Sequence, residues 1–83
     1  MSAGALLFEI VGWIGAAALL LAYGLASSGR LPATGRGFQL LNLTGSAALA
    51  ANSGFHGAFP STALNGVWMA IAVVALLRAR VTA

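Results

Sequence analysis

The sequence predicts an all-α fold, namely an integral membrane bundle of three transmembrane helices with the N-terminus outside and the C-terminus in the cytoplasm. The composition predicts a membrane protein, because 60% of the 83 residues are hydrophobic and only 6% are charged. A soluble surface needs about a quarter of charged residues. Residues 10–29 and 37–77 contain no charged side chain, and these stretches predict where the chain crosses the bilayer. We expect residues 1–83 to form one domain.

The first span is predicted at about residues 6–27. No Lys or Arg precedes it, and its uncharged run is longer than the apolar core of most signal peptides. Both observations favour a membrane span over a cleaved signal. The segment SSGRLPATGRG, residues 27–37, is rich in turn-forming residues and predicts the first loop.

The second uncharged stretch is about twice as long as one span requires. It is interrupted at SGFHGAFPS, residues 53–61, which predicts a loop between spans at about residues 34–53 and 60–78. Thr34 is a candidate N-cap of the second helix. Pro60 suits the first turn of the third helix, where its missing N–H costs nothing.

Arginine placement sets the predicted topology. Arg30 and Arg36 lie in the first loop, Arg78 and Arg80 lie in the tail, and the N-terminus and second loop have no Lys or Arg. The positive-inside rule then places the first loop and the C-terminus in the cytoplasm. We expect a multi-pass protein of the bacterial cytoplasmic (inner) membrane, with the lipid bilayer as its first partner. Four scattered arginines make no basic patch for nucleic acid.

This topology brings several polar residues to one depth. The first helix runs inward and the second outward, so Glu9 and Asn52 both lie near the outer face. His56 is in the outer loop, and Asn65 is in the outer half of the third helix. Asn52 and Asn65 are either hydrogen-bonding links between helices or contacts to a ligand. Glu9 is either a functional group or a solvated carboxylate at the membrane interface.

The second helix is built from small residues, as in GSAALAA at residues 45–51. Asn42, Gly45 and Asn52 fall on one stripe of it, and Gly12 and Ala16 form a small pair in the first helix. Small residues let helix backbones approach closely, which predicts helix packing at Gly12, Ala16, Asn42 and Gly45. Three helices leave few neighbours for so much close-packing surface. We therefore expect a homodimer or a larger membrane-protein complex.

Catalysis is not expected. The chain has one Glu, one His and neither Lys nor Cys, so no paired carboxylates or activated nucleophile can be assembled. A metal site needs three or four ligands, and His56 has no second His, Cys or Asp near it in the sequence. We therefore predict no enzyme activity, no metal and no cofactor. Trp13 and Tyr23 fit aromatic belts at the two membrane interfaces, and Trp68 faces either the core or lipid.

One resemblance follows from these features. The chain has three predicted spans, an outer N-terminus and the run GWIGA at residues 12–16, and its third helix opens with Pro60 followed by Asn65. In these features it resembles the SemiSWEET half-transporters of the PQ-loop superfamily over residues 12–80. The resemblance implies that the third helix lies between the first and second. It also implies a parallel homodimer around a sugar path, with Asn65 contacting the sugar. The family's Pro-Gln pair is absent, which leaves Gly24 as the implied hinge beside Pro60.

The sequence is also similar to an uncharacterised set of three-span bacterial membrane proteins. Their recurring N-x-x-G, Asn-Ser and L-N-x-x-W patterns match Asn42, Gly45, Asn52, Ser53, Asn65 and Trp68.

Two functions remain open at this stage. The first is a SemiSWEET-like half-transporter for a small polar, sugar-like solute, acting as a homodimer. Its substrate contacts would be Asn52, Asn65 and Trp68, and its outer vestibule would contain Glu9 and His56. The alternative is a non-catalytic accessory subunit packed on a larger respiratory or photosynthetic membrane complex.

Overall fold

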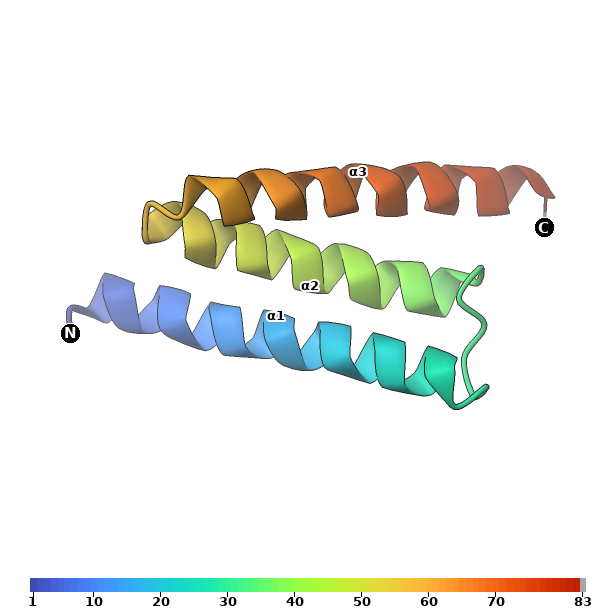
Figure 1. Cartoon of the computed structure of the whole chain (residues 1–83), viewed down its shortest axis with the longest axis horizontal. Helices are drawn as coiled ribbons and strands as arrows, with labels where there is room; N and C mark the ends of the chain where they lie inside the picture. The colour runs from blue at the N-terminus through green and yellow to red at the C-terminus, as the bar shows by residue number, and fades with distance from the viewer. Residues whose placement is uncertain (83) are drawn as a thin grey trace.

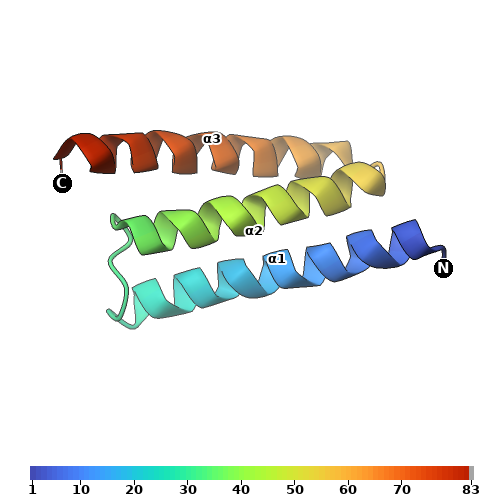
Figure 2. The same ribbon diagram turned by 180° about the vertical axis from the view of Figure 1, so that it is seen from behind.

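A computed structural model describes the backbone of residues 1–82 and the side chains of residues 1–78, so the predicted role of the Arg80 side chain lies outside the described part. The described chain forms three helices, α1 (Ala3–Ser27), α2 (Arg36–Phe55) and α3 (Phe59–Thr82). Successive helices run in opposite directions, so the N-terminus lies at the end with the α2–α3 loop and the C-terminus at the end with the α1–α2 loop (Figures 1 and 2).

The ends of the helices follow from local chemistry. The Ser2 hydroxyl accepts a hydrogen bond from the Ala5 N–H at 3.0 Å and caps α1. Gly29 and Gly57 have positive φ angles of 77° and 72° in the two loops, a region that glycine enters without steric cost. The predicted cap at Thr34 is wrong, because the residue before α2 is Gly35, and no side chain caps that helix. Pro60 is the second residue of α3.

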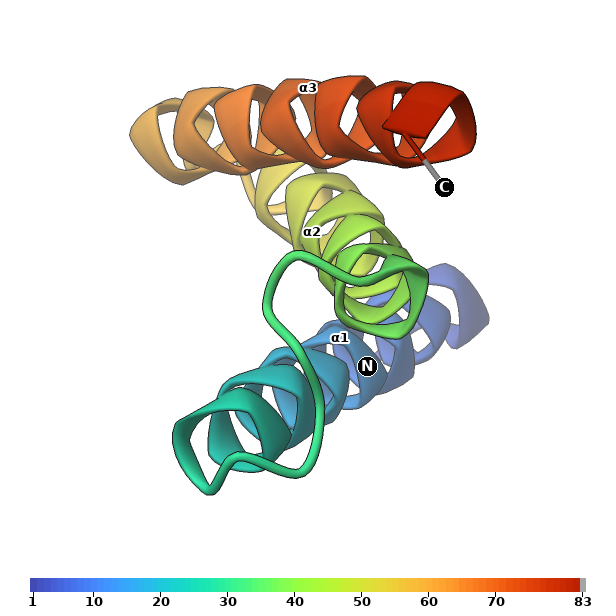
Figure 3. The same ribbon diagram turned by 90° about the vertical axis from the view of Figure 1, so that its right-hand side faces the viewer.

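Helix α2 lies between the other two helices. It packs against α1 on one side and α3 on the other, whereas α1 and α3 share no contact among the described residues; Figure 3 shows this open arrangement end-on. The SemiSWEET order, with the third helix in the middle, is therefore wrong for this chain. The physical reason is that α2 offers small side chains in both directions, Gly45 towards α1 and Ser53 towards α3.

The α1–α2 interface is a close approach of two backbones. An added Cβ at Gly15 would lie 2.9 Å from the Gly45 carbonyl oxygen and 2.8 Å from the Ala48 Cβ. An added Cβ at Gly45 would lie 2.7 Å from the Leu19 Cγ. Atoms do not approach that closely, so only glycine fits at either position. These two residues set the separation of the helices.

The buried and exposed side chains are distributed as expected for a protein surrounded by lipid. Among the described side chains, the buried hydrophobic ones are Ala22, Phe38 and Ala72, while many large apolar side chains on all three helices are exposed. A soluble domain buries its large apolar side chains. The molecule instead buries small and polar side chains, including Asn42 and Ser46.

Two of the described helices are long and apolar enough to cross a membrane, Ala3–Ser27 and Phe59–Arg78. The middle helix, α2, is also 20 residues long, but its Gly, Ser, Thr, Asn and Gln residues make it less apolar. These findings favour a membrane protein, with two candidate spans among the described residues.

Candidate functional site

A small cavity lies on the α1–α2 face, in the half of the bundle that contains the N-terminus. Its volume is about 240 Å³. Its polar lining comes from Glu9, Trp13 and Asn52, and Gly12, Ala16 and Leu49 form the rest. The Trp13 indole N–H donates a hydrogen bond to a Glu9 carboxylate oxygen at 3.1 Å. The cavity therefore offers a carboxylate, an amide and an aromatic face within one small volume.

Asn52 links two helices. Its side-chain amide donates a hydrogen bond to the Phe8 carbonyl oxygen at 2.7 Å, across the α1–α2 interface. Gly12 makes room for this contact, because an added Cβ there would lie 2.5 Å from the Asn52 Nδ2 atom. The Asn52 amide therefore connects α2 to the backbone of α1 while it lines the cavity.

Asn65 and Trp68 lie elsewhere. Both are on α3, on the opposite side of α2 from α1, and neither lines the cavity around Asn52. The Asn65 amide donates to the Ser61 carbonyl oxygen of its own helix at 2.9 Å. The Trp68 side chain is 40% exposed. Within one chain, the three predicted substrate contacts are thus divided between two faces.

His56 lies in the turn after α2 and is exposed. Its Nδ1 atom is 2.8 Å from the Asn52 carbonyl oxygen, and its ring meets the Phe55 ring edge-on with centroids 5.3 Å apart. Phe55 in turn stacks on Phe8 with centroids 4.4 Å apart. Within the described residues, no three His, Cys, Asp or Glu side chains lie close enough to hold a metal ion.

Asn42 is the most enclosed amide, with 4% of its surface exposed. Its side-chain oxygen lies 3.4 Å from the Ser46 hydroxyl, which donates to it. Both side chains are on α2 and buried in the bundle. At 3.4 Å the contact is long for a hydrogen bond between an alcohol and an amide. Both groups are enclosed by the bundle, so they are placed for packing rather than for binding a ligand.

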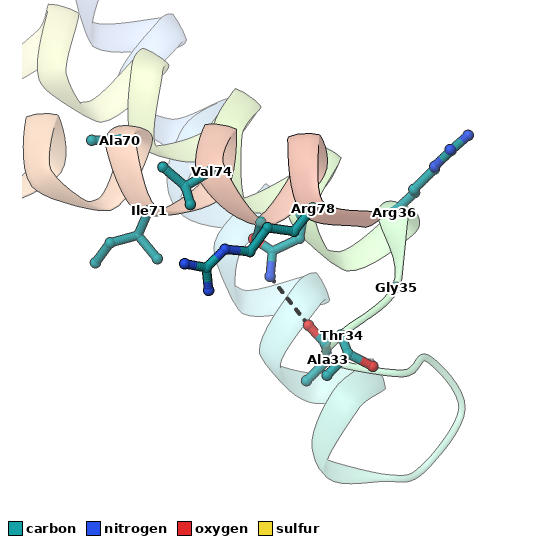
Figure 4. Close-up of a pocket in the computed structure, with 10 residues that line it drawn as sticks. Ala33, Thr34, Gly35, Arg36, Ala70, Ile71, Val74 and Arg78 are labelled. Atoms are coloured by element: carbon teal, nitrogen blue, oxygen red, sulfur yellow. Dashed lines mark hydrogen bonds between the residues drawn. The ribbon is translucent and has the colours of Figure 1, made fainter. Parts of the chain in front are cut away.

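A second and larger cavity lies at the other end of the bundle, between the start of α2 and the second half of α3 (Figure 4). Its volume is about 1050 Å³. We call it the α2–α3 groove; its lining residues are Ala33, Thr34, Gly35, Arg36, Gln39, Ala70, Ile71, Val74, Ala75 and Arg78. The Arg78 side chain reaches back along the groove, whereas the Arg36 side chain points away from it (Figure 4).

Gln39, near the start of α2, is one of the residues that line this groove. Its side-chain amide donates a hydrogen bond to the Ala33 carbonyl oxygen at 3.2 Å, which holds the loop against the helix. Its side-chain oxygen is buried without a hydrogen-bond partner among the described residues.

Sequence reasoning missed several of these features. Trp13 was interpreted as an interfacial aromatic residue, although its spacing of four residues from Glu9 places both on one helix face. The sequence predicts helix packing at Gly12 and Ala16 but does not distinguish Gly15 between them. The α2–α3 groove joins residues separated by more than 30 positions, so no local pattern marks it.

Comparison with known proteins shows the family to which this chain belongs. Neither the curated proteins nor the solved structures contain a match to this chain. A model of an uncharacterised bacterial family matches residues 8–83. That match covers nearly the whole sequence, from within α1 to the end of α3, and the chain belongs to this family.

Proposed function

We propose that the chain is a multi-pass protein of the bacterial inner membrane in which all three helices span the bilayer. The exposed large apolar side chains of α1 and α3 support this proposal. The lower hydropathy of α2 fits its position, because a helix covered by neighbours on two sides meets less lipid. With the α1–α2 loop in the cytoplasm, Arg30, Arg36 and Arg78 all lie at the inner surface.

Within that membrane, the protein is a non-catalytic subunit that packs on a larger membrane complex through α3. The observation that carries this proposal is the uncovered face around Gly66. No other described helix or loop has an atom within 4 Å of a Cβ added at Gly66, and Ala63 and Ala70, on the same face, are also exposed. Small residues spaced by three or four positions are typical of surfaces on which another transmembrane helix packs.

The hydrogen bonds of the polar side chains also support a non-catalytic packing role. Asn52 and Ser53 bind neighbouring helices, and Asn65 binds its own backbone. The small residues at the α1–α2 interface are already in contact, whereas a Cβ added at Gly66 would meet no atom of another described helix within 4 Å. A face of small residues permits the close approach of another transmembrane helix, which supports a helix of another protein as its occupant.

The test is extraction of the chain from its native membrane in a mild detergent, followed by native mass measurement. We expect the chain to leave the membrane with foreign subunits in a fixed stoichiometry. Gly66→Leu should release it from them by blocking close approach. Ala17→Leu, which adds similar bulk to an exposed position of α1, is the matched control and should leave the complex intact. Recovery of the chain only as a homodimer would contradict the proposal.

A half-transporter for a small polar solute is the second candidate, and the cavity around Glu9, Trp13 and Asn52 favours it. Because α3 lies on the other side of α2, Asn65 and Trp68 would have to join that path from a second copy. Purified protein in liposomes should then take up a polar solute, and Asn52→Ala should reduce that uptake. Uptake equal to that of empty liposomes across a panel of sugars and polyols would exclude this candidate.

A further inference from the structure

The α2–α3 groove has an apolar wall and a cationic end. Its wall on α3 consists of Ala70, Ile71, Val74 and Ala75, which form successive turns of one helix face. Arg78 follows at the end of that face, and its side chain lies along the groove (Figure 4). The combination of a long apolar surface and a terminal guanidinium matches a molecule with an alkyl chain and an anionic head.

The start of α2 adds a second positive feature at the same end. Gly35 and Arg36 line the groove, and no side chain caps the helix there. The first N–H groups of a helix carry a partial positive charge and attract anions. The hydrogen bond from Gln39 to the Ala33 carbonyl oxygen holds the loop beside these groups. The anionic head would therefore lie between the α2 N-terminus and Arg78.

The dimensions fit one leaflet of a membrane. From Ala70 to Arg78 the helix rises about 12 Å at 1.5 Å per residue, and half of a hydrocarbon core is about 15 Å thick. Arg30, Arg36 and Arg78 place this end at the cytoplasmic surface, where anionic lipids attract basic side chains. The volume of about 1050 Å³ is at the upper end of the range for ligand pockets.

We propose that the α2–α3 groove binds an anionic phospholipid of the inner leaflet. One acyl chain lies along Ile71 and Val74, and the phosphate lies between the Arg78 guanidinium and the first turn of α2. This inference rests on the proposed placement of the protein in the inner membrane, but it does not depend on the proposed packing of α3 against another subunit. Ala70 borders both surfaces, so the lipid would lie beside the partner helix.

The test is native mass spectrometry of the purified full-length chain with phosphatidylglycerol and phosphatidylcholine supplied in equal amounts. We expect preferential retention of phosphatidylglycerol. Arg78→Gln should lower that preference about fivefold, since one basic residue near an anionic surface contributes ~1 kcal/mol. Arg78→Lys should keep most of the preference. Circular dichroism of each variant verifies that the helices remain formed.

Arg30→Gln is the matched control, because it removes the same charge from the same end of the bundle without touching the groove. Equal losses in Arg30→Gln and Arg78→Gln would overturn the proposal in favour of general charge attraction. Full competition by soluble glycerol phosphate would also overturn it, since a site for the head alone does not need the apolar wall. Lipid binding without foreign subunits in the native extract would leave this inference standing and contradict only the packing role of α3.

Discussion

The two interfaces of α2 are built by different means. Towards α1, two glycine backbones meet, and Asn52 donates a short hydrogen bond to the Phe8 carbonyl oxygen. Towards α3, the Ser53 and Thr62 hydroxyls lie 2.9 Å apart, and the other end of the interface opens into the α2–α3 groove. Backbone contact fixes the separation of two helices along their length, whereas a hydroxyl pair fixes it at one point. The α1–α2 interface is therefore held by close backbone approach, whereas the α2–α3 interface is held by side-chain contacts.

The largest effect is expected from bulk at the glycine contact. Gly15→Leu forces side-chain atoms into the Gly45 carbonyl oxygen and the Ala48 Cβ, and overpacking of this kind costs about 3 kcal/mol. The midpoint of unfolding in a denaturing detergent, followed by circular dichroism, measures this loss. Gly24→Leu is the matched control in the same helix, because no other described element has an atom within 4 Å of a Cβ added there. Equal stability of the two variants would show that the backbone contact does not set the interface.

A smaller effect is expected from the amide that crosses the same interface. Asn52→Ala removes the 2.7 Å hydrogen bond to the Phe8 carbonyl oxygen, and interhelical hydrogen bonds in membranes contribute about 1 to 2 kcal/mol at most. Asn65→Ala is the control, because its amide binds the Ser61 carbonyl oxygen within α3. The same unfolding assay should rank Asn52→Ala as clearly less stable. The reverse order would contradict a stabilising role of the Asn52 amide at the α1–α2 interface.

The smallest effect is expected at the hydroxyl contact with α3. Ser53→Ala removes the pair with Thr62, and contacts of this kind average about 0.6 kcal/mol. Ser61→Ala, on the exposed start of α3, is the control and should leave stability unchanged. Combining Ser53→Ala with Thr62→Val in a double-mutant cycle isolates the pair. A loss larger than that of Asn52→Ala would reverse the contrast between the two interfaces.

Composition and charge alone determined a large part of this protein. The scarcity of charges marked the membrane class, and the loops were found from SSGRLPATGRG and SGFHGAFPS because turn-forming residues act locally. Gly12, Gly45 and Asn42 were recognised as packing candidates because a helix places residues three or four apart on one face. Each of these inferences uses information contained within one helix or one loop.

Only the tertiary structure decided the order of the helices and the partner of each polar group. Helix α2 carries small residues on several sides, so its sequence is compatible with either neighbour on either face. Shared depth placed Asn52 and Asn65 at one level, but depth does not give direction around the helix axis. Asn52 faces α1 because Gly12 leaves room there. Asn65 is on α3, on the other side of α2. The α2–α3 groove likewise depends on how α3 lies against the start of α2, which no local pattern in the sequence gives.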